Sequence, residues 1–227
     1  MVSLPEPPLA FVHHRTHRLI ASRYPTIGVF DELVSAEDAA AAMEIELLTN
    51  GRLRAAGRLP PSMLVHGAQG ATMINAAFAY TDVRGGRFHG PELGCWYAAF
   101  AVQTAIRETV HHHTRRLALS EAGFRQTIQM RELLTTPRAR LHDIRGRADE
   151  LALIYDRDDY AASQTFGRAL RQAGSKGIVY HSVRHEGGTC LAVFDPWLLP
   201  PVVQGGHYQY SWTGAPEPQI VKLAGAG

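Results

Sequence analysis

The spacing of apolar and polar positions along the chain predicts several short strands. Residues 95–100 form a short apolar run between turn residues, which is typical of a buried strand. Residues 126–134 alternate between polar and apolar side chains, as a strand with one buried face does. Patterns of the same two kinds predict three more strands, at residues 17–22, 177–182 and 190–194.

Helices are predicted where apolar residues recur at helical spacing or where start and stop signals flank a segment. Ser35 can cap a helix that ends at Asn50. The apolar run 71–80 suits a helix or a strand, and we interpret it as a helix. Residues 161–173 form another predicted helix, which Gly174 ends. A fourth helix begins just after the predicted strand at residues 95–100. Its inward stripe consists of Val102, Ala105, Ile106, Thr109 and Val110.

The order of these elements favours an α+β fold. Strands and helices are mixed without a strict β-α-β alternation, which argues against a doubly wound sheet. The chain has no internal repeat and no linker long enough to separate two cores, so we expect one mixed domain, at residues 16–212. Prolines near the start predict a loose N-terminal segment over residues 1–15, and glycine and prolines near the end predict a C-terminal tail over residues 213–227.

The composition is that of a globular chain without a strong charge bias. Of the 227 residues, 45% are hydrophobic and 19% are charged, which excludes wholesale disorder. The formal net charge of +2 is too small to indicate a nucleic-acid or membrane surface. No apolar run approaches the roughly 18 residues that cross a bilayer, and the first residues do not resemble a secretory leader, so a cytoplasmic protein is expected.

Several chemical signatures are absent or have a simpler explanation. The chain has no phosphate-binding loop that ends in Lys-Ser/Thr, no G-x-S-x-G elbow and no H-E-x-x-H motif. His111, His112 and His113 are consecutive, so on a helix they point about 100° apart and cannot all bind one metal ion. No metal site is expected. Cys95 and Cys190 fit no metal spacing and agree with a reducing compartment, and a single bridge between them stays open.

The candidate chemistry lies in three residues that follow one another along the chain. Arg87 stands between a glycine and an aromatic residue, Tyr97 lies on a predicted strand, and Glu108 lies on the next helix at the border of its apolar stripe. A border position can face a cleft. From the residues alone, ordinary structural roles are favoured, with Arg87 on the surface and Tyr97 in the core. Glu108 would then pair with Arg107 or His112.

A resemblance to a known family changes that weighting. Together with Arg18 in HRLIAS, four passages resemble the RES-domain family, which is named for recurrent Arg, Glu and Ser: GGRFHG, WYAAFAVQTAIRETVHH, DDYAASQTFGRALRQAGSKGIVYHSVR and CLAVFDP. Their order and spacing carry the resemblance, which extends over most of the chain. It implies a fold similar to ADP-ribosyltransferases, with a split β-sheet and flanking helices. It also implies an NAD-degrading toxin of a bacterial toxin–antitoxin pair.

The resemblance also implies a set of site residues. In chain order, the recurrent residues of the family match Arg18, Arg87, Tyr97, Glu108 and Ser182. Gln164 falls at a further recurrent position. The chain departs from the family pattern at His89 and Cys190, where Asn is frequent. The first departure affects how the ribose or phosphate is held, and the second is interpreted as a packing substitution.

These residues suit cleavage of the nicotinamide–ribose bond of NAD. Breaking that bond requires a stabilised oxocarbenium-like ribose, and a carboxylate beside the ribose supplies the opposite charge. Glu108 is the candidate for that role, and Arg87 and Tyr97 are the other catalytic candidates. Two guanidiniums bind a diphosphate through planar, charged hydrogen bonds, which suits Arg18 and Arg87.

The remaining residues complete a binding set for NAD. Tyr97 can stack on a ring of NAD, Ser182 can hydrogen-bond ribose or phosphate, and Gln164 is assigned to binding as well. Water or inorganic phosphate can capture the ribose cation, and no cofactor is expected beyond NAD as the substrate. Two alternatives stay open: transfer of ADP-ribose to a macromolecule, and a non-catalytic module that binds nucleotides or nucleic acid.

The resemblance implies a protein partner in addition to NAD. Family members are restrained by small Xre-like antitoxins, so an Xre-like antitoxin is expected to bind this chain. We expect no contact with a membrane. Contact with nucleic acid is expected only indirectly, through the antitoxin.

Overall fold

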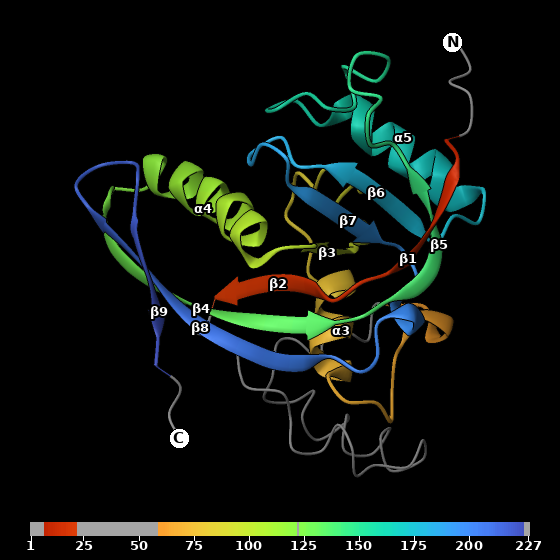
Figure 1. Ribbon diagram of the computed structural model, residues 1–227, viewed down its shortest axis with the longest axis horizontal. Coiled ribbons are helices and arrows are strands. Elements are labelled where there is room, and N and C mark those ends of the chain that lie inside the picture. The colour runs from red at the N-terminus through yellow and green to blue at the C-terminus, as the bar shows by residue number, and fades with distance from the viewer. Residues whose placement is uncertain (1–6, 22–58, 122, 225–227) are drawn as a thin grey trace.

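The computed structural model describes residues 7–21, 59–121 and 123–224 (Figure 1). The helix predicted from Ser35 to Asn50 lies outside these residues. No helix among the described residues is long and apolar enough to cross a membrane. In chain order, the elements are β1 (Leu9–His13), β2 (Thr16–Ala21), the 3₁₀ helix η2 (Pro61–Met63), α3 (Ala71–Ala79), β3 (Trp96–Ala99), α4 (Val102–Ala118), β4 (Arg125–Thr135), β5 (Arg138–Asp143), α5 (Ala161–Gln172), β6 (Gly177–His181), β7 (Thr189–Val193), the 3₁₀ helix η3 (Pro196–Leu198), β8 (Val203–Thr213) and β9 (Gln219–Leu223).

The described strands form a mixed sheet in the order β1-β5-β6-β7-β3-β2-β4-β8-β9. Neighbouring strands are antiparallel, except that β5 and β6 run parallel. In the described residues, β2 and β3 pair at a single position, His17 with Ala99. Beyond that position β3 continues with β7 and β2 continues with β4. The sheet is therefore split into two half-sheets, β1-β5-β6-β7-β3 and β2-β4-β8-β9.

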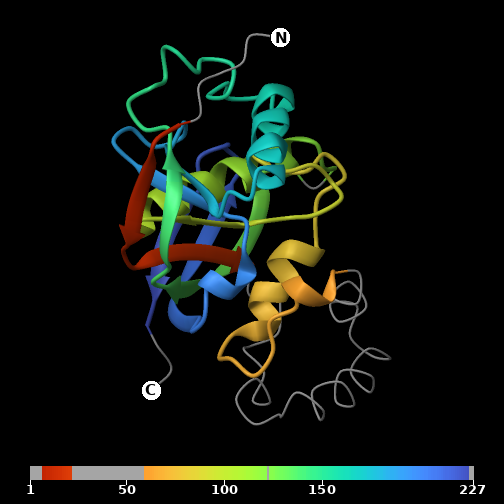
Figure 2. The same ribbon diagram turned by 90° about the vertical axis from the view of Figure 1, so that its right-hand side faces the viewer.

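The helices pack against different parts of this split sheet. Figure 1 shows α4 over the half-sheet of β2, β4 and β8, and α5 beside β5 and β6. The buried stripe of α4 includes Ala105, Ile106, Val110 and Leu117. The view in Figure 2 shows α3 and α5 on the side of the molecule away from β1. The helices therefore flank the sheet, and α4 lies where the two half-sheets diverge.

The expected α+β class with a split sheet and flanking helices is confirmed. The strands predicted at residues 95–100, 126–134, 177–182 and 190–194 correspond to β3, β4, β6 and β7. The predicted helices after residue 100 and at residues 71–80 and 161–173 correspond to α4, α3 and α5. Cys95 and Cys190 are both buried and free, so no bridge joins them.

The expectations for the two ends of the chain are wrong in part. The segment expected to be loose, residues 1–15, contains β1, which pairs with β5. The expected tail, residues 213–227, contains β9, which pairs with β8. Both are edge strands next to prolines or glycines, and their pairing depends on a partner strand that local sequence signals do not reveal. Strands β5 and β8 were not predicted either, since β5 carries exposed arginines at alternate positions.

The close approach of α5 to the 85–90 loop generates a prediction about stability. In an exposed helix interior, replacing Gly by Ala stabilises by about 1 kcal/mol. At Gly167, however, an added Cβ would lie 2.3 Å from the carbonyl oxygen of Phe88. We expect Gly167→Ala to lower the free energy of unfolding by roughly 1–3 kcal/mol in urea denaturation. Thr165→Ala, at an exposed position of α5, is the control and should change it by less than about 0.5 kcal/mol. A Gly167→Ala variant at least as stable as the wild type would contradict this packing.

Candidate active site

Three adjacent strands present polar side chains on one face of their half-sheet. Cys190 on β7 lies opposite Ala99 on β3 and opposite Tyr180 on β6. Tyr97 precedes Ala99 by two residues on β3. Because side chains alternate along a strand, Tyr97, Cys190 and Tyr180 point to the same face. This face carries the candidate site.

Helix α4 adds a carboxylate to this face. The hydroxyl of Ser182 donates a hydrogen bond of 2.5 Å to Oε1 of Glu108, and the thiol of Cys190 lies 3.9 Å from the same oxygen. One turn earlier along α4, Oγ1 of Thr104 lies 2.9 Å from Nδ1 of His185. Two side-chain contacts, one helical turn apart, therefore connect α4 with the turn that follows β6.

The hydroxyl of Ser182 is fully occupied by contacts within the chain. Its oxygen accepts hydrogen bonds from the backbone N–H groups of Arg184, at 3.1 Å, and His185, at 3.0 Å. A serine hydroxyl has one proton and two acceptor lone pairs, and here the proton is donated to Glu108. In this structure, Ser182 thus orients the carboxylate of Glu108. Its assignment as a direct contact of NAD stays a prediction.

The other titratable side chains on this face are neutral at neutral pH. Burial raises the pKa of the Cys190 thiol above its ordinary range, and the charge of Glu108 raises it further. Burial also raises the pKa of Tyr180 well above its ordinary value, with added contributions from Cys190 and Glu108. The pKa of Tyr97 is raised well above its ordinary value, again mainly by burial. Side chains with such raised pKa values keep their protons.

The loop of residues 85–90 lies over the same face. The backbone N–H of Phe88 donates a hydrogen bond of 2.8 Å to the hydroxyl of Tyr97. The ring of Phe88 packs edge-on against Tyr180, with 4.9 Å between the ring centroids. Tyr97 therefore positions this loop, in addition to any contact that it makes with a ligand.

Gln164 on α5 positions the same loop from the other side. Its Nε2 donates hydrogen bonds to the carbonyl oxygens of Arg84, at 2.7 Å, and Gly86, at 3.1 Å. His89, at the position where the family often has Asn, has its Nδ1 2.6 Å from the carbonyl oxygen of Gly90, to which it donates. Burial lowers the pKa of His89, so its ring is neutral at neutral pH. The loop is thus held by backbone and side-chain hydrogen bonds.

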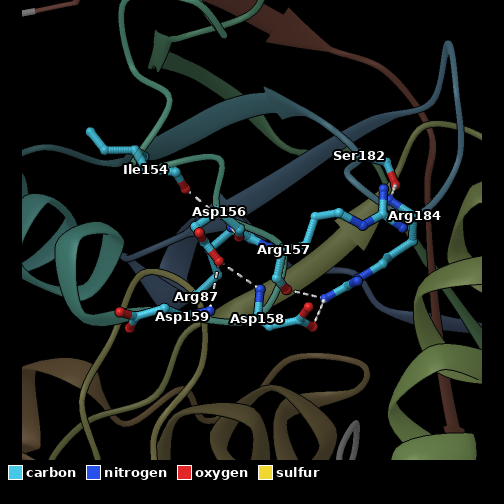
Figure 3. A network of polar contacts seen from close by, with 8 residues as sticks. All are labelled: Arg87, Ile154, Asp156, Arg157, Asp158, Asp159, Ser182 and Arg184. Atoms are coloured by element: carbon cyan, nitrogen blue, oxygen red, sulfur yellow. Dashed lines mark hydrogen bonds and ion pairs between the residues drawn. The ribbon is translucent and has the colours of Figure 1, made fainter.

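Arg87 is buried and holds the segment that precedes α5. It is 7% exposed, and its Nη1 donates hydrogen bonds to the carbonyl oxygens of Ile154, at 3.1 Å, and Asp156, at 2.7 Å (Figure 3). Its guanidinium also lies over the ring of Tyr160, 4.6 Å from the centroid. Nη2 is buried and has no hydrogen-bond partner among the described residues. The expectation of a surface residue is therefore wrong.

Arg18 lies at the split between the half-sheets. Its Nη1 donates a hydrogen bond of 3.0 Å to the carbonyl oxygen of Tyr97. Its guanidinium lies 4.9 Å from the centroid of the Trp96 ring. If the pairing of β2 with β3 continued, the backbone of Leu19 would lie opposite Tyr97. The guanidinium of Arg18 therefore supplies a hydrogen bond to the carbonyl of Tyr97, at the edge where the pairing of β2 with β3 stops.

An open pocket of about 400 Å³ lies beside Ser182. Figure 3 shows two of its other lining residues, Arg157 and Arg184, close to Ser182. Its lining is made by Ala148, Tyr155, Arg157, His181, Ser182, Val183, Arg184, His185 and Glu186. Among the described residues, no three His, Cys, Asp or Glu side chains gather as they do around a metal ion.

The sequence of this chain matches the model of a known protein family. The model of the RES domain matches residues 63–213, which is more than half of the chain. The chain belongs to the RES domain family. The uncharacterized protein y4oC of Sinorhizobium fredii is 30% identical over 203 residues, which cover 87% of this chain and 83% of that protein.

Among solved structures, similarity is found to a chain in the crystal structure of the M. tuberculosis MbcT–MbcA toxin–antitoxin complex. The TM-score is 0.46 and the sequence identity is 13%. The match covers 94% of this chain and 86% of that chain.

The fold brings the sequence-predicted residues together in linked groups. Glu108 and Ser182 are in direct contact. Tyr97 and Gln164 both hold the loop that carries Arg87. Arg18 is linked to this group through the carbonyl of Tyr97. Among these six residues, Ser182 lines the open pocket.

Sequence reasoning missed several residues that the structure places around this candidate site. Tyr180 was included in a predicted strand without a role, although its spacing before Ser182 places both near the same strand end. Thr104 gave no signal, because its contact with His185 joins elements distant in sequence. Arg157 lies in a charged run, and such runs usually indicate a solvated surface.

The hydrogen bond between Tyr97 and the loop generates a prediction. Tyr97→Phe leaves the buried N–H of Phe88 without its acceptor, so we expect the free energy of unfolding to fall by roughly 1–3 kcal/mol. Tyr208→Phe is the matched control, because that hydroxyl on β8 makes no hydrogen bond with the described residues, and it should change the value by less than about 0.5 kcal/mol. Equal effects of the two substitutions in chemical denaturation would refute the role given to Tyr97.

Proposed function

We propose that this RES domain protein is an enzyme that cleaves the nicotinamide–ribose bond of NAD. The observation that carries the proposal is the carboxylate of Glu108, which Ser182 holds beside an open pocket. The neighbouring Cys190 and Tyr180 are neutral, so Glu108 is the acidic group of this cluster. The resemblance of the site residues to the RES pattern supports NAD as the substrate.

The proposed chemistry uses a fixed negative charge. As the bond to ribose breaks, its electron pair leaves with nicotinamide, and positive charge develops on the ribose. A carboxylate that is oriented before the reaction stabilises this charge without reorganisation. Ser182 holds Oε1 of Glu108, whereas Oε2 accepts no hydrogen bond from the described residues. Oε2 is therefore the oxygen proposed to face a ribose hydroxyl.

The acceptor is water or inorganic phosphate. Attack by water on the ribose cation gives ADP-ribose and releases one proton, whereas attack by phosphate gives phosphorylated ADP-ribose. Either reaction requires only that the acceptor reach the ribose cation through the open pocket beside Ser182. Transfer of ADP-ribose to a macromolecule would use the same cation, and product analysis distinguishes the three.

Arg18 and Arg87 are proposed to bind the diphosphate of NAD. The Nη1 atoms of both residues already donate to carbonyl oxygens, those of Tyr97 for Arg18 and of Ile154 and Asp156 for Arg87. For Arg87, Nη2 is buried and has no hydrogen-bond partner among the described residues, so a direct contact with the diphosphate would require the surrounding segment to move. The ring of Tyr97 is proposed to stack on a ring of NAD while its hydroxyl holds Phe88.

The proposed biological role is that of a toxin in the bacterial cytoplasm. An enzyme that consumes a central cofactor must be restrained, and the RES-domain resemblance implies an Xre-like antitoxin as the restraining partner. Such a partner is proposed to cover the site and to offer a carboxylate to the arginines in place of the diphosphate.

Replacing Glu108 tests the proposed enzyme directly. Glu108→Gln keeps the volume and removes the charge, so we expect a fall in the rate of NAD cleavage of about 100-fold or more. The rate is measured from nicotinamide release by purified protein, with and without inorganic phosphate. Glu121→Gln, at an exposed position beyond α4, is the control and should keep the wild-type rate. Unchanged turnover in a folded Glu108→Gln variant would remove Glu108 from the mechanism.

Expression in a bacterial host tests the toxin role. The wild-type chain alone should arrest growth and deplete cellular NAD, and the Glu108→Gln variant should do neither. Coexpression with the product of a neighbouring antitoxin-like gene should restore both growth and NAD. If folded wild-type protein leaves NAD and growth unaffected, the toxin role is wrong, and the alternative of a non-catalytic binding module is favoured.

A further inference from the structure

The open pocket beside Ser182 is lined by arginine and histidine side chains that the proposed catalytic set does not use. Arg157 belongs to the segment between β5 and α5, whereas His181, Arg184 and His185 lie at the end of β6 and in the turn after it. These residues come from two parts of the chain that the fold brings together around a pocket of about 400 Å³. A volume of this size is typical of small-molecule sites.

Arg184 has a structural role in this pocket. Its side chain is 6% exposed, and Nη2 lies 3.3 Å from Oδ1 of Asp158. The same nitrogen donates a hydrogen bond to the carbonyl oxygen of Arg157. Arg184 thus ties the segment before α5 to the turn after β6, and its charge is balanced by Asp158.

The acidic side chains of this segment are also engaged. Oδ1 of Asp156 accepts hydrogen bonds of 2.8 Å from the backbone N–H groups of Asp158 and Asp159 (Figure 3). These bonds close a local turn and lower the pKa of Asp156. Glu186, the acidic residue that lines the pocket, is exposed, so solvent and salt screen its charge.

Arg157 is the cation that remains available to a ligand. Its guanidinium makes no hydrogen bond or ion pair with the described residues, and Figure 3 shows its side chain extending toward Ser182. The ring of His181 makes no hydrogen bond with the described part of the chain. Nδ1 of His185 is held by Thr104, which leaves Nε2 for other contacts. The available polar atoms on this wall are therefore mainly hydrogen-bond donors.

We propose that this pocket binds a phosphate group, with Arg157 as its main contact and His181 and His185 as further contacts. A guanidinium binds phosphate through two parallel, charged hydrogen bonds. The group is either a phosphate of the nucleotide or free inorganic phosphate. Its place in the reaction, next to Ser182 and Glu108, rests on the proposed function, but its binding is measured without any reaction.

The test is isothermal titration of the full chain with inorganic phosphate and, separately, with AMP. We expect saturable binding that Arg157→Gln weakens by about tenfold or more, since a hydrogen bond to a charged group is lost. Arg140→Gln, an exposed arginine on β5 outside the pocket, is the matched control and should bind as the wild type does. Both arginines are exposed, so neither substitution is expected to disturb folding.

Competition distinguishes the two sources of the phosphate group. If AMP displaces inorganic phosphate, the nucleotide phosphate occupies the site, and if only inorganic phosphate binds, the site serves the free ion. Either result supports the proposal when Arg157→Gln weakens that binding by about tenfold or more. Wild-type affinity of Arg157→Gln for both ligands, or no saturable binding of either to the wild type, overturns it.

The same measurements separate this proposal from the proposed enzyme. NAD cleavage without phosphate or AMP binding would overturn the phosphate site and leave the enzyme standing. Binding that depends on Arg157, without any NAD cleavage, would support the site and refute the enzyme.

Discussion

Helix α4 separates the two half-sheets, and its adjacent residues Glu108 and Thr109 contact different halves. Oγ1 of Thr109 lies 2.9 Å from the hydroxyl of Tyr210 on β8, whereas Glu108 accepts the 2.5 Å hydrogen bond from Ser182 after β6. Consecutive helix residues point about 100° apart, so a helix between diverging sheets can make both contacts. The position of the carboxylate therefore depends on the split between β2 and β3.

The split also leaves backbone groups of β3 without a partner strand among the described residues. A backbone carbonyl at the edge where a ladder stops needs a donor, and Arg18 supplies one to Tyr97. The structural and proposed ligand-binding roles of Arg18 are compatible, because a guanidinium has five N–H donors. Substitution of this arginine would consequently affect both the join between the half-sheets and any contact with a diphosphate.

Two arginines hold the segment before α5 and so shape the pocket. Arg87 binds the carbonyl oxygens of Ile154 and Asp156, and Arg184 binds that of Arg157. Carbonyl oxygens carry only partial charge, and no carboxylate among the described residues pairs with the guanidinium of Arg87. The diphosphate proposed to bind here would supply a negative charge beside this guanidinium.

The elements with strong local signals follow from the sequence, and so does the choice of residue types that we propose for the chemistry. The helix of residues 161–173 and the strand before Glu108 were predicted because their periodicity and end signals are local. The edge strands β1 and β9, the burial of Arg87 and the contact of Glu108 with Ser182 became visible only in the folded chain. The physical reason is that each depends on a partner or a covering segment distant in sequence, which no local pattern specifies.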